Sequence, residues 1–146
     1  MKKKPGSKKK ESYKKWVSRM VAFGKKKLSL QEWTAYMTYE KCKNKEDEGV
    51  AGTCEIKVDY LWFNMCLYPA VENFYNKGKY EEAFETILHE LCHVYTEPMY
   101  LIANEEVPKS RDREIEMLRE QGTTRICSAI LKLIPEKDYM PLTNKK

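Results

Sequence analysis

The stretch from Tyr80 to Pro98 constrains the fold of this chain more than any other part of the sequence. Its apolar side chains recur every three or four residues, at Phe84, Ile87, Leu88, Leu91 and Val94 or Tyr95. This period predicts a helix with one apolar face buried against a core. Pro98 is expected to end the helix, and we expect a loop over residues 100–109.

Before this helix, the sequence changes from a helical period to a strand period. A first helix is expected from Ser12 to about Gly24, with one apolar face formed by Tyr13, Trp16, Val17, Met20 and Val21. Polar and apolar residues then alternate over residues 33–40 and 53–60, which predicts two strands separated by a polar loop at residues 43–52. Residues 61–68 are apolar and aromatic, so they form either a buried strand or an aromatic packing segment, closed by Pro69.

Two further elements complete the predicted order. A turn is expected at residues 76–78, and a long helix is expected from about Ser110 to Pro135. No structure is assigned to the polar residues that follow. The order of helix, strands, helix and helix indicates an α+β fold with a small antiparallel sheet of two or three strands.

The size of the chain fits one domain. It has 146 residues, which we divide into a basic arm at residues 1–12, a domain at 13–134 and a polar tail at 135–146. No apolar run approaches the roughly 20 residues that cross a bilayer, so no contact with a membrane is expected. We expect no secretory signal, because Pro5, Gly6 and more lysines follow the first basic residues.

The cysteines favour a reducing compartment. They are spread along the chain without any CxxC pair, at Cys42, Cys54, Cys66, Cys92 and Cys127. We therefore expect reduced thiols packed as small apolar groups in a cytoplasmic protein.

Positive charge is concentrated at the start of the chain. Residues 1–27 hold 12 basic residues and one acidic residue, a net charge of +11, so the other residues carry −6 of the total +5. Such an arm could contact phosphates of a nucleic acid, with an affinity that falls as salt rises. The alternative is a solvated tail that keeps the protein soluble.

The helix expected at Tyr80 contains the sequence His89-Glu90-Leu91-Cys92-His93, an HExxH motif. Residues four apart lie on one helical face, so both imidazoles can bind one zinc ion. Glu90 is rotated by about 100° from His89, close enough to accept a proton from a zinc-bound water without being a ligand. The chain has only two histidines, and both are in this motif.

A catalytic zinc site takes a third protein ligand. It must be a carboxylate or a thiolate here, because no other histidine exists and Thr96 and Met99 stand where a metzincin has glycine and histidine. The expected C-terminal helix offers Glu114, Glu116 and Glu120. We favour Glu120, because Gly122 beside it would allow close helix packing. Glu116 is the main alternative, and Glu97, Glu105 and Glu106 are further ones.

The run from Glu85 to Val94, which follows alternating strands and precedes a glutamate-bearing helix, resembles the small phage-type metallopeptidases. These are minimal gluzincin-like zincins, similar in core to proteases that cleave repressors of mobile elements, and residues 30–33 also resemble that group. The resemblance covers residues 28–134. It implies a zincin-like fold, zinc ligation by His89, His93 and Glu120, catalysis by Glu90, and the cytoplasm of a host cell if a phage encodes the protein.

Two functions are therefore open from the sequence. The first is a zinc-dependent peptidase that acts on a protein or peptide bound along a strand edge. Its transition-state donor could be Tyr95, Tyr100 or Tyr139. The second is a zinc-binding or nucleic-acid-associated module without turnover, which would use the lysine-rich N-terminus.

Overall fold

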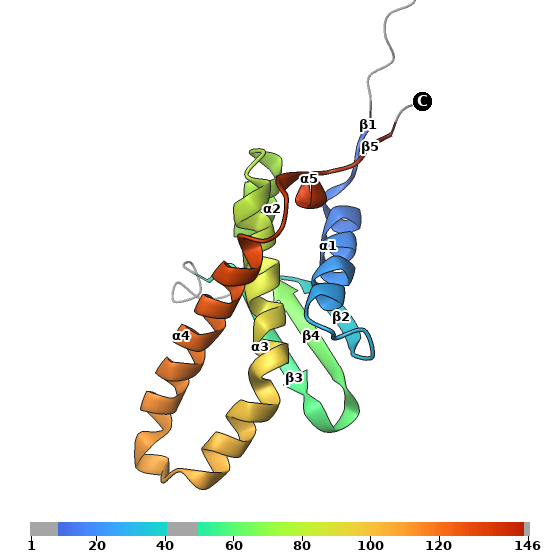
Figure 1. Ribbon diagram of the computed structural model, residues 1–146. Helices are drawn as coiled ribbons and strands as arrows, with labels where there is room; N and C mark the ends of the chain where they lie inside the picture. Colours follow the sequence, from blue (N-terminus) through green and yellow to red (C-terminus); the bar gives the residue numbers. More distant parts are fainter. Residues whose placement is uncertain (1–8, 41–49, 145–146) are drawn as a thin grey trace, which may run out of the picture.

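The sheet at the centre of the fold has three strands. In this computed structural model, which describes residues 9–40 and 50–144, they are β2 (Thr34–Tyr39), β3 (Gly52–Lys57) and β4 (Trp62–Leu67). The order is β2-β4-β3, so β4 is central and β3 is an edge strand (Figure 1). The inward side chains of β4 alternate with half-buried ones and include Phe63, Met65 and Leu67. The strand expected at residues 61–68 is therefore confirmed, rather than an aromatic packing segment.

The sheet is mixed, and the expectation of an antiparallel sheet was wrong. β3 and β4 are antiparallel, because only four residues, 58–61, connect them. β2 is parallel to β4, with Ala35 opposite Phe63. The longer connection from β2 to β3 allows this arrangement, whereas alternation along a single strand carries no information about the direction of its neighbour. Most of the loop expected at residues 43–52, namely 43–49, lies outside the described residues.

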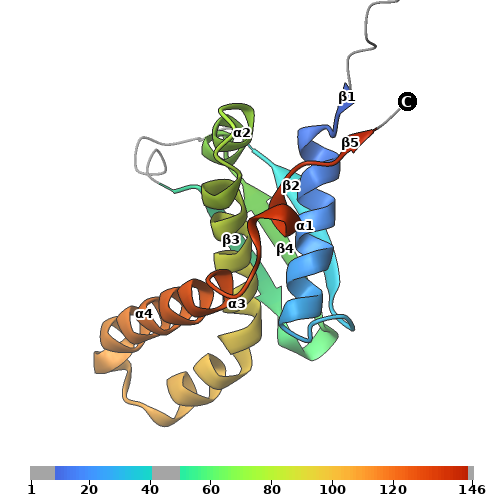
Figure 2. The same ribbon diagram turned by 45° about the horizontal axis from the view of Figure 1, so that its top comes forward.

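Two helices lie side by side on the sheet, as Figures 1 and 2 show from two directions. They are α1 (Tyr13–Lys27) and α3 (Tyr80–Glu106). The short helix α2 (Pro69–Asn76) comes before α3 in the chain, and a turn at Gly78 connects the two. The inner faces of α1 and α3 and the sheet enclose a core whose largest fully buried side chains include Trp16, Met20, Phe63, Met65, Leu67, Phe84, Ile87, Leu88 and Leu91. A Cβ on Gly24 of α1 would lie 2.5 Å from Leu91 Cδ1, so glycine permits this close approach of α1 to α3.

Helix α3 does not end at Pro98, and the loop expected at residues 100–109 was wrong over most of its length. The helix continues to Glu106, and after a short 3-10 turn α4 (Asp112–Leu131) returns alongside it. A proline removes one backbone N–H from the ladder, but packing between neighbouring helices can offset that loss. The resulting α3–α4 hairpin extends beyond the sheet (Figure 1). The α4 helix begins two residues after Ser110 and ends before Pro135.

The C-terminal segment is structured, contrary to expectation. It forms α5 (Glu136–Tyr139) and β5 (Thr143–Asn144), and β5 pairs with β1 (Lys9–Lys10). The Trp16 indole N–H donates to the Tyr139 carbonyl at 2.7 Å. Arg19 donates to the carbonyls of Asp138 and Met140. These side chains of α1 therefore hold the two ends of the described chain together.

Over the residues described, the fold is α+β with five α-helices and this mixed sheet. None of these helices is both long and apolar enough to cross a lipid bilayer.

Candidate metal centre

The HExxH residues lie in the middle of α3, where the helix passes the edge strand β3. His89 and His93 are one helical turn apart, and their Nε2 atoms face each other at 3.1 Å. The His93 ring is almost fully buried, while His89 is half-buried. The helical spacing thus brings both imidazoles to one point, as the sequence predicts.

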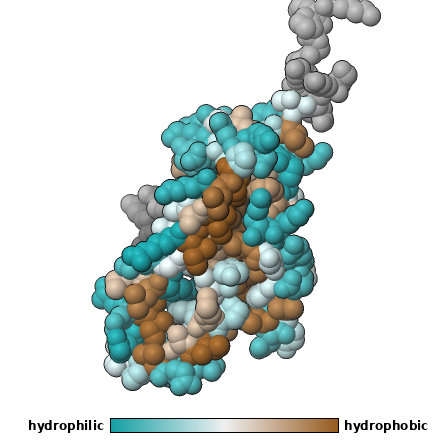
Figure 3. Space-filling view, in the orientation of Figure 1, coloured by the Kyte–Doolittle hydropathy of each residue, from teal (hydrophilic) through white to brown (hydrophobic). Residues whose placement is uncertain are grey.

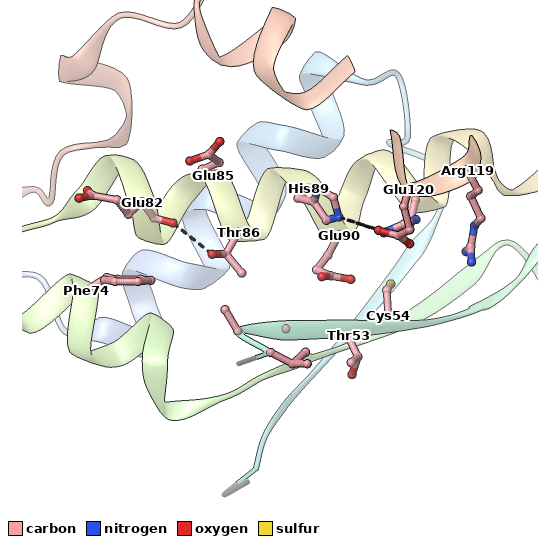
Figure 4. A pocket seen from close by; sticks show the side chains of 14 residues that line it. Thr53, Cys54, Phe74, Glu82, Glu85, Thr86, His89, Glu90, Arg119 and Glu120 are labelled. Atoms are coloured by element: carbon pink, nitrogen blue, oxygen red, sulfur yellow. Dashed lines mark hydrogen bonds and ion pairs between the residues drawn. The ribbon is translucent and has the colours of Figure 1, made fainter. Parts of the chain in front are cut away.

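Glu120 reaches the same point from α4. One carboxylate oxygen lies 3.3 Å from His93 Nε2, and the other lies 3.6 Å from His89 Nε2 (Figure 4). Candidate ligand atoms of the three residues all lie within 4.8 Å of one another. The structure therefore brings together the three residues predicted as metal ligands.

The spacing of these atoms suits a tetrahedral ion. Bonds of about 2.0 to 2.1 Å at tetrahedral angles separate donor atoms by about 3.3 Å. The two Nε2 atoms are 3.1 Å apart, and the Glu120 carboxylate approaches His93 Nε2 to 3.3 Å with one oxygen and His89 Nε2 to 3.6 Å with the other. Two imidazole nitrogens and one carboxylate also form a donor set that zinc accepts, so the residues present fit such an ion.

Thr123, one turn after Glu120 on α4, faces the other nitrogen of His93. Its hydroxyl lies 3.4 Å from His93 Nδ1, and the side chain is fully buried. A proton on Nδ1 directed at this hydroxyl leaves the lone pair of Nε2 pointing at the candidate metal position. Burial, together with His89 and Arg119, lowers the pKa of His93 to about 4, so the ring is neutral at neutral pH, the form that binds metal.

Glu90 extends from α3 toward β3. Its side chain is buried, and burial raises its pKa to about 7; the Glu120 carboxylate adds to this rise and Arg119 opposes it. Directly opposite is Gly52 of β3, where a Cβ would lie 3.3 Å from Glu90 Cγ and also press on Leu67. A larger residue at position 52 would therefore crowd the Glu90 side chain.

Arg119 is the centre of an ion-pair network beside the ligands. Its guanidinium contacts Glu97 of α3 at 2.6 Å and Glu116 at 3.2 Å. It also lies 4.4 Å from the centre of the Tyr100 ring, and the Tyr100 hydroxyl donates to Glu116 at 2.8 Å. The Glu97 pair is largely shielded from solvent and joins the two helices of the hairpin.

A cleft of about 700 Å³ contains this group of residues. Its walls come from α2, α3, α4, β3 and residues 50–51, and His89, Glu90 and Glu120 point into it (Figure 4). Glu82 and Glu85 stand toward one end of the cleft and Arg119 toward the other. The cavity therefore contains a potential metal position, the buried carboxylate of Glu90 and one end of the edge strand β3.

Several predicted candidates lie elsewhere. Glu116 bonds to Tyr100 and Arg119, Glu114 pairs with Arg111, and Glu97 pairs with Arg119. Tyr139 packs on the opposite part of the fold against Phe84. Glu120 was favoured as the third ligand because Gly122 was expected to allow close packing of α4 on α3. That reason was wrong, since a Cβ on Gly122 would meet no atom within 4 Å and the helices make no close approach there.

Sequence reasoning missed Arg119, Thr123 and Gly52. Their roles depend on which face of α4 turns toward α3 and on how closely β3 approaches Glu90. The three-residue spacing from Glu120 to Thr123, which puts both on one helical face, could have indicated Thr123, whereas no local pattern indicates Arg119 or Gly52. Compared with protein-family models, curated proteins and solved structures, the chain matches none.

Proposed function

We propose that this protein is a zinc-dependent metallopeptidase with a zincin-like arrangement of helix, edge strand and glutamate-bearing helix. The observation that carries the proposal is the convergence of His89, His93 and Glu120, with nitrogen and carboxylate oxygen atoms 3.1 to 3.6 Å apart. A zinc ion bound there would polarise a peptide carbonyl and acidify a water molecule in its open fourth position. The HExxH sequence and this ligand set support membership of the phage-type metallopeptidases.

In this mechanism, Glu90 is the acid–base group. Its carboxylate is held in the cleft, directly after His89 and three residues before His93 in the sequence, and opposite Gly52. Glu90 would take a proton from the attacking water and later deliver it to the leaving amine nitrogen. Burial in a cleft keeps this carboxylate from being surrounded by bulk water and fixes its position.

The edge strand provides a place for an extended peptide. Among the described residues, β3 pairs with β4 on one side only, and Gly52, Thr53 and Cys54 line the cleft on the other. A peptide that adds to this edge would form backbone hydrogen bonds with β3 and pass directly below Glu90. This geometry favours a protein or peptide substrate over a compact small molecule.

The deciding experiment is zinc content of the purified protein, with variants His93→Ala, Glu120→Ala and, as a matched control on the same helix, Glu116→Ala. We expect about one zinc ion per chain in the parent and in Glu116→Ala, and loss of zinc in the other two. Zinc in Glu120→Ala but not in Glu116→Ala would assign the third ligand to Glu116. A parent protein that stays free of zinc after reconstitution would overturn the proposal.

Hydrolysis is tested separately with Glu90→Gln. This variant keeps the size of the side chain but cannot accept the proton, so we expect it to bind zinc normally and to lose at least about 100-fold in kcat on a peptide library. Full activity in Glu90→Gln would contradict the proposed mechanism.

The lysine-rich N-terminus supports a second candidate function, contact with a nucleic acid. The exposed side of α1 continues the positive charge with Lys14, Lys15, Lys26 and Lys27. Deletion of residues 1–8 together with Lys14→Ala and Lys15→Ala should then abolish salt-dependent binding of DNA or RNA. Unchanged binding would remove this candidate.

We place the protein in the cytoplasm, that of the host if a phage encodes it. The support is chemical, because all four cysteines of the described residues are free and two of them are buried.

A further inference from the structure

The α3–α4 hairpin carries an apolar surface that the rest of the described chain leaves uncovered. Six of its large apolar side chains are exposed: Tyr95, Met99, Leu101, Ile102, Met117 and Leu118. Of these, Tyr95, Met99 and Ile102 follow each other at helical spacing and form one stripe on α3. Figure 3 shows hydrophobic colour on this projecting hairpin, as well as over the middle of the molecule above it. Contiguous apolar patches on a surface mark places where another molecule binds.

A groove between the two helices runs along the same hairpin. It has a volume of about 450 Å³, and apolar side chains such as Met99, Ala103 and Leu118 line it. At Gly122 there is open space, since an added Cβ would meet nothing within 4 Å. The two helices thus leave a channel in which side chains from another helix could insert.

The charges at the tip of the hairpin indicate which partner fits. Glu105 and Glu106 end α3, whose last turn has no basic residue, although acidic side chains are unfavourable at a helix C-terminus. Lys109 and Arg113 stand where the chain turns into α4. These four side chains are exposed, and none of them is in an ion pair within the described part of the chain. The tip therefore presents an acidic end of α3 next to residues 109–114, where Lys109, Arg111 and Arg113 outnumber Asp112 and Glu114 and leave a net positive charge.

We propose that this hairpin is the interface of a homodimer with twofold symmetry. The symmetry axis runs along the hairpin, so that α3 of one copy packs beside α4 of the other and the four helices form a bundle. Met99, Ile102 and Leu118 fill the grooves of the opposite copy. Glu105 and Glu106 then face Lys109 and Arg113 across the interface, which makes the surface complementary to itself. The cleft at His89 is not part of this interface, so the dimer does not depend on the proposed peptidase activity.

The first test is the mass of the full chain in solution by light scattering and sedimentation. We expect a dimer at about 100 μM that dissociates at least about tenfold more readily in Ile102→Glu. Leu133→Glu is the matched control, because Leu133 is even more exposed but lies outside the hairpin. Circular dichroism of both variants verifies the fold. A monomeric parent, or a dimer that Ile102→Glu leaves unchanged, would overturn the proposal. The groove would then be a binding site for a different protein.

The second test uses charge reversal at the tip. Glu105→Lys with Glu106→Lys makes the whole tip basic, and Lys109→Glu with Arg113→Glu makes it acidic. Each double variant alone should be monomeric, since like charges then meet across the twofold axis, while an equal mixture of the two should form a heterodimer. Self-association of either double variant as strong as that of the parent would contradict the predicted pairing of α3 with α4.

Discussion

Arg119 of α4 donates a hydrogen bond of 2.6 Å to Glu97 of α3, and the residue after Arg119 is the candidate zinc ligand Glu120. The ion pair is largely shielded from solvent on both sides. It lies between the two helices that carry the three candidate ligands. Its geometry therefore fixes how α4 is turned against α3, and with it the direction of Glu120.

We predict that Arg119→Leu weakens zinc binding by about tenfold, the scale on which residues behind metal ligands act. Glu97→Arg combined with Arg119→Glu should recover part of the affinity, because the reversed pair can join the helices again. Affinity is measured by competition with a chromophoric chelator. Arg111→Leu is the control, since Arg111 forms an exposed pair with Glu114 at the start of the same helix. Equal affinities in Arg119→Leu and the parent would show that the pair does not position Glu120.

The local part of the site was predictable from sequence, and the part made by helix packing was not. His89, Glu90 and His93 share one helix, so their spacing alone fixes their relative positions. Glu120 was also named, but through an expected close contact at Gly122 that does not exist. What positions Glu120 is the packing of α4 on α3, and no local pattern encodes the rotation of one helix about another.

Alanine substitution of Gly24 in α1 and of Gly122 in α4 should change the stability of the fold in opposite directions. In Gly122→Ala the new Cβ meets no atom, so the gain in helix propensity should stabilise the fold by about 0.5 to 1 kcal/mol. In Gly24→Ala the Cβ would lie 2.5 Å from Leu91 Cδ1 in the core, and we expect a net loss of about 1 kcal/mol. Chemical denaturation in the Ile102→Glu background measures both without a contribution from self-association. A stabilising Gly24→Ala would mean that Leu91 repacks without cost.

Other differences between expectation and structure have the same origin in long-range contacts. The prediction that α3 ends at Pro98 rested on the backbone hydrogen bond that a proline removes, and it left out the packing of α4 along α3. The C-terminal residues look polar and irregular in sequence, yet Trp16 and Arg19 provide partners for their carbonyls. A tail is ordered or disordered according to such partners, which lie far away in the sequence.

Glu11 should make stability depend on pH. Burial alone would raise the pKa of this carboxyl, but hydrogen bonds from Arg19 and the Leu142 N–H, with the charges of Arg19 and Lys15, lower it below 4.5. Because the folded state lowers the pKa, the stabilisation is present above the unfolded value and is lost as the pH falls through the folded value. Glu11→Gln should therefore cost about 1 to 2 kcal/mol at pH 7.

The difference between Glu11→Gln and the parent should shrink steadily below about pH 4.5. Urea denaturation from pH 7 down to pH 3 measures it. Glu55→Gln serves as the control, because its pair with Lys57 is exposed and 3.8 Å long. A difference that stays constant over this range would show that charge on Glu11 is not what holds the C-terminal segment to α1.

Tyr139 anchors the C-terminal segment in the core, although α5 is only four residues long. Its ring stacks on Phe84 at 5.7 Å, its hydroxyl donates to Glu81 at 3.0 Å, and its carbonyl accepts the Trp16 N–H. Tyr139→Ala should cost about 3 kcal/mol, because it leaves a cavity over Phe84. Tyr60→Ala, at a position 77% exposed, should change the free energy of unfolding by less than about 0.5 kcal/mol. Equal effects of the two substitutions would mean that the segment after Pro135 docks on the domain without stabilising it.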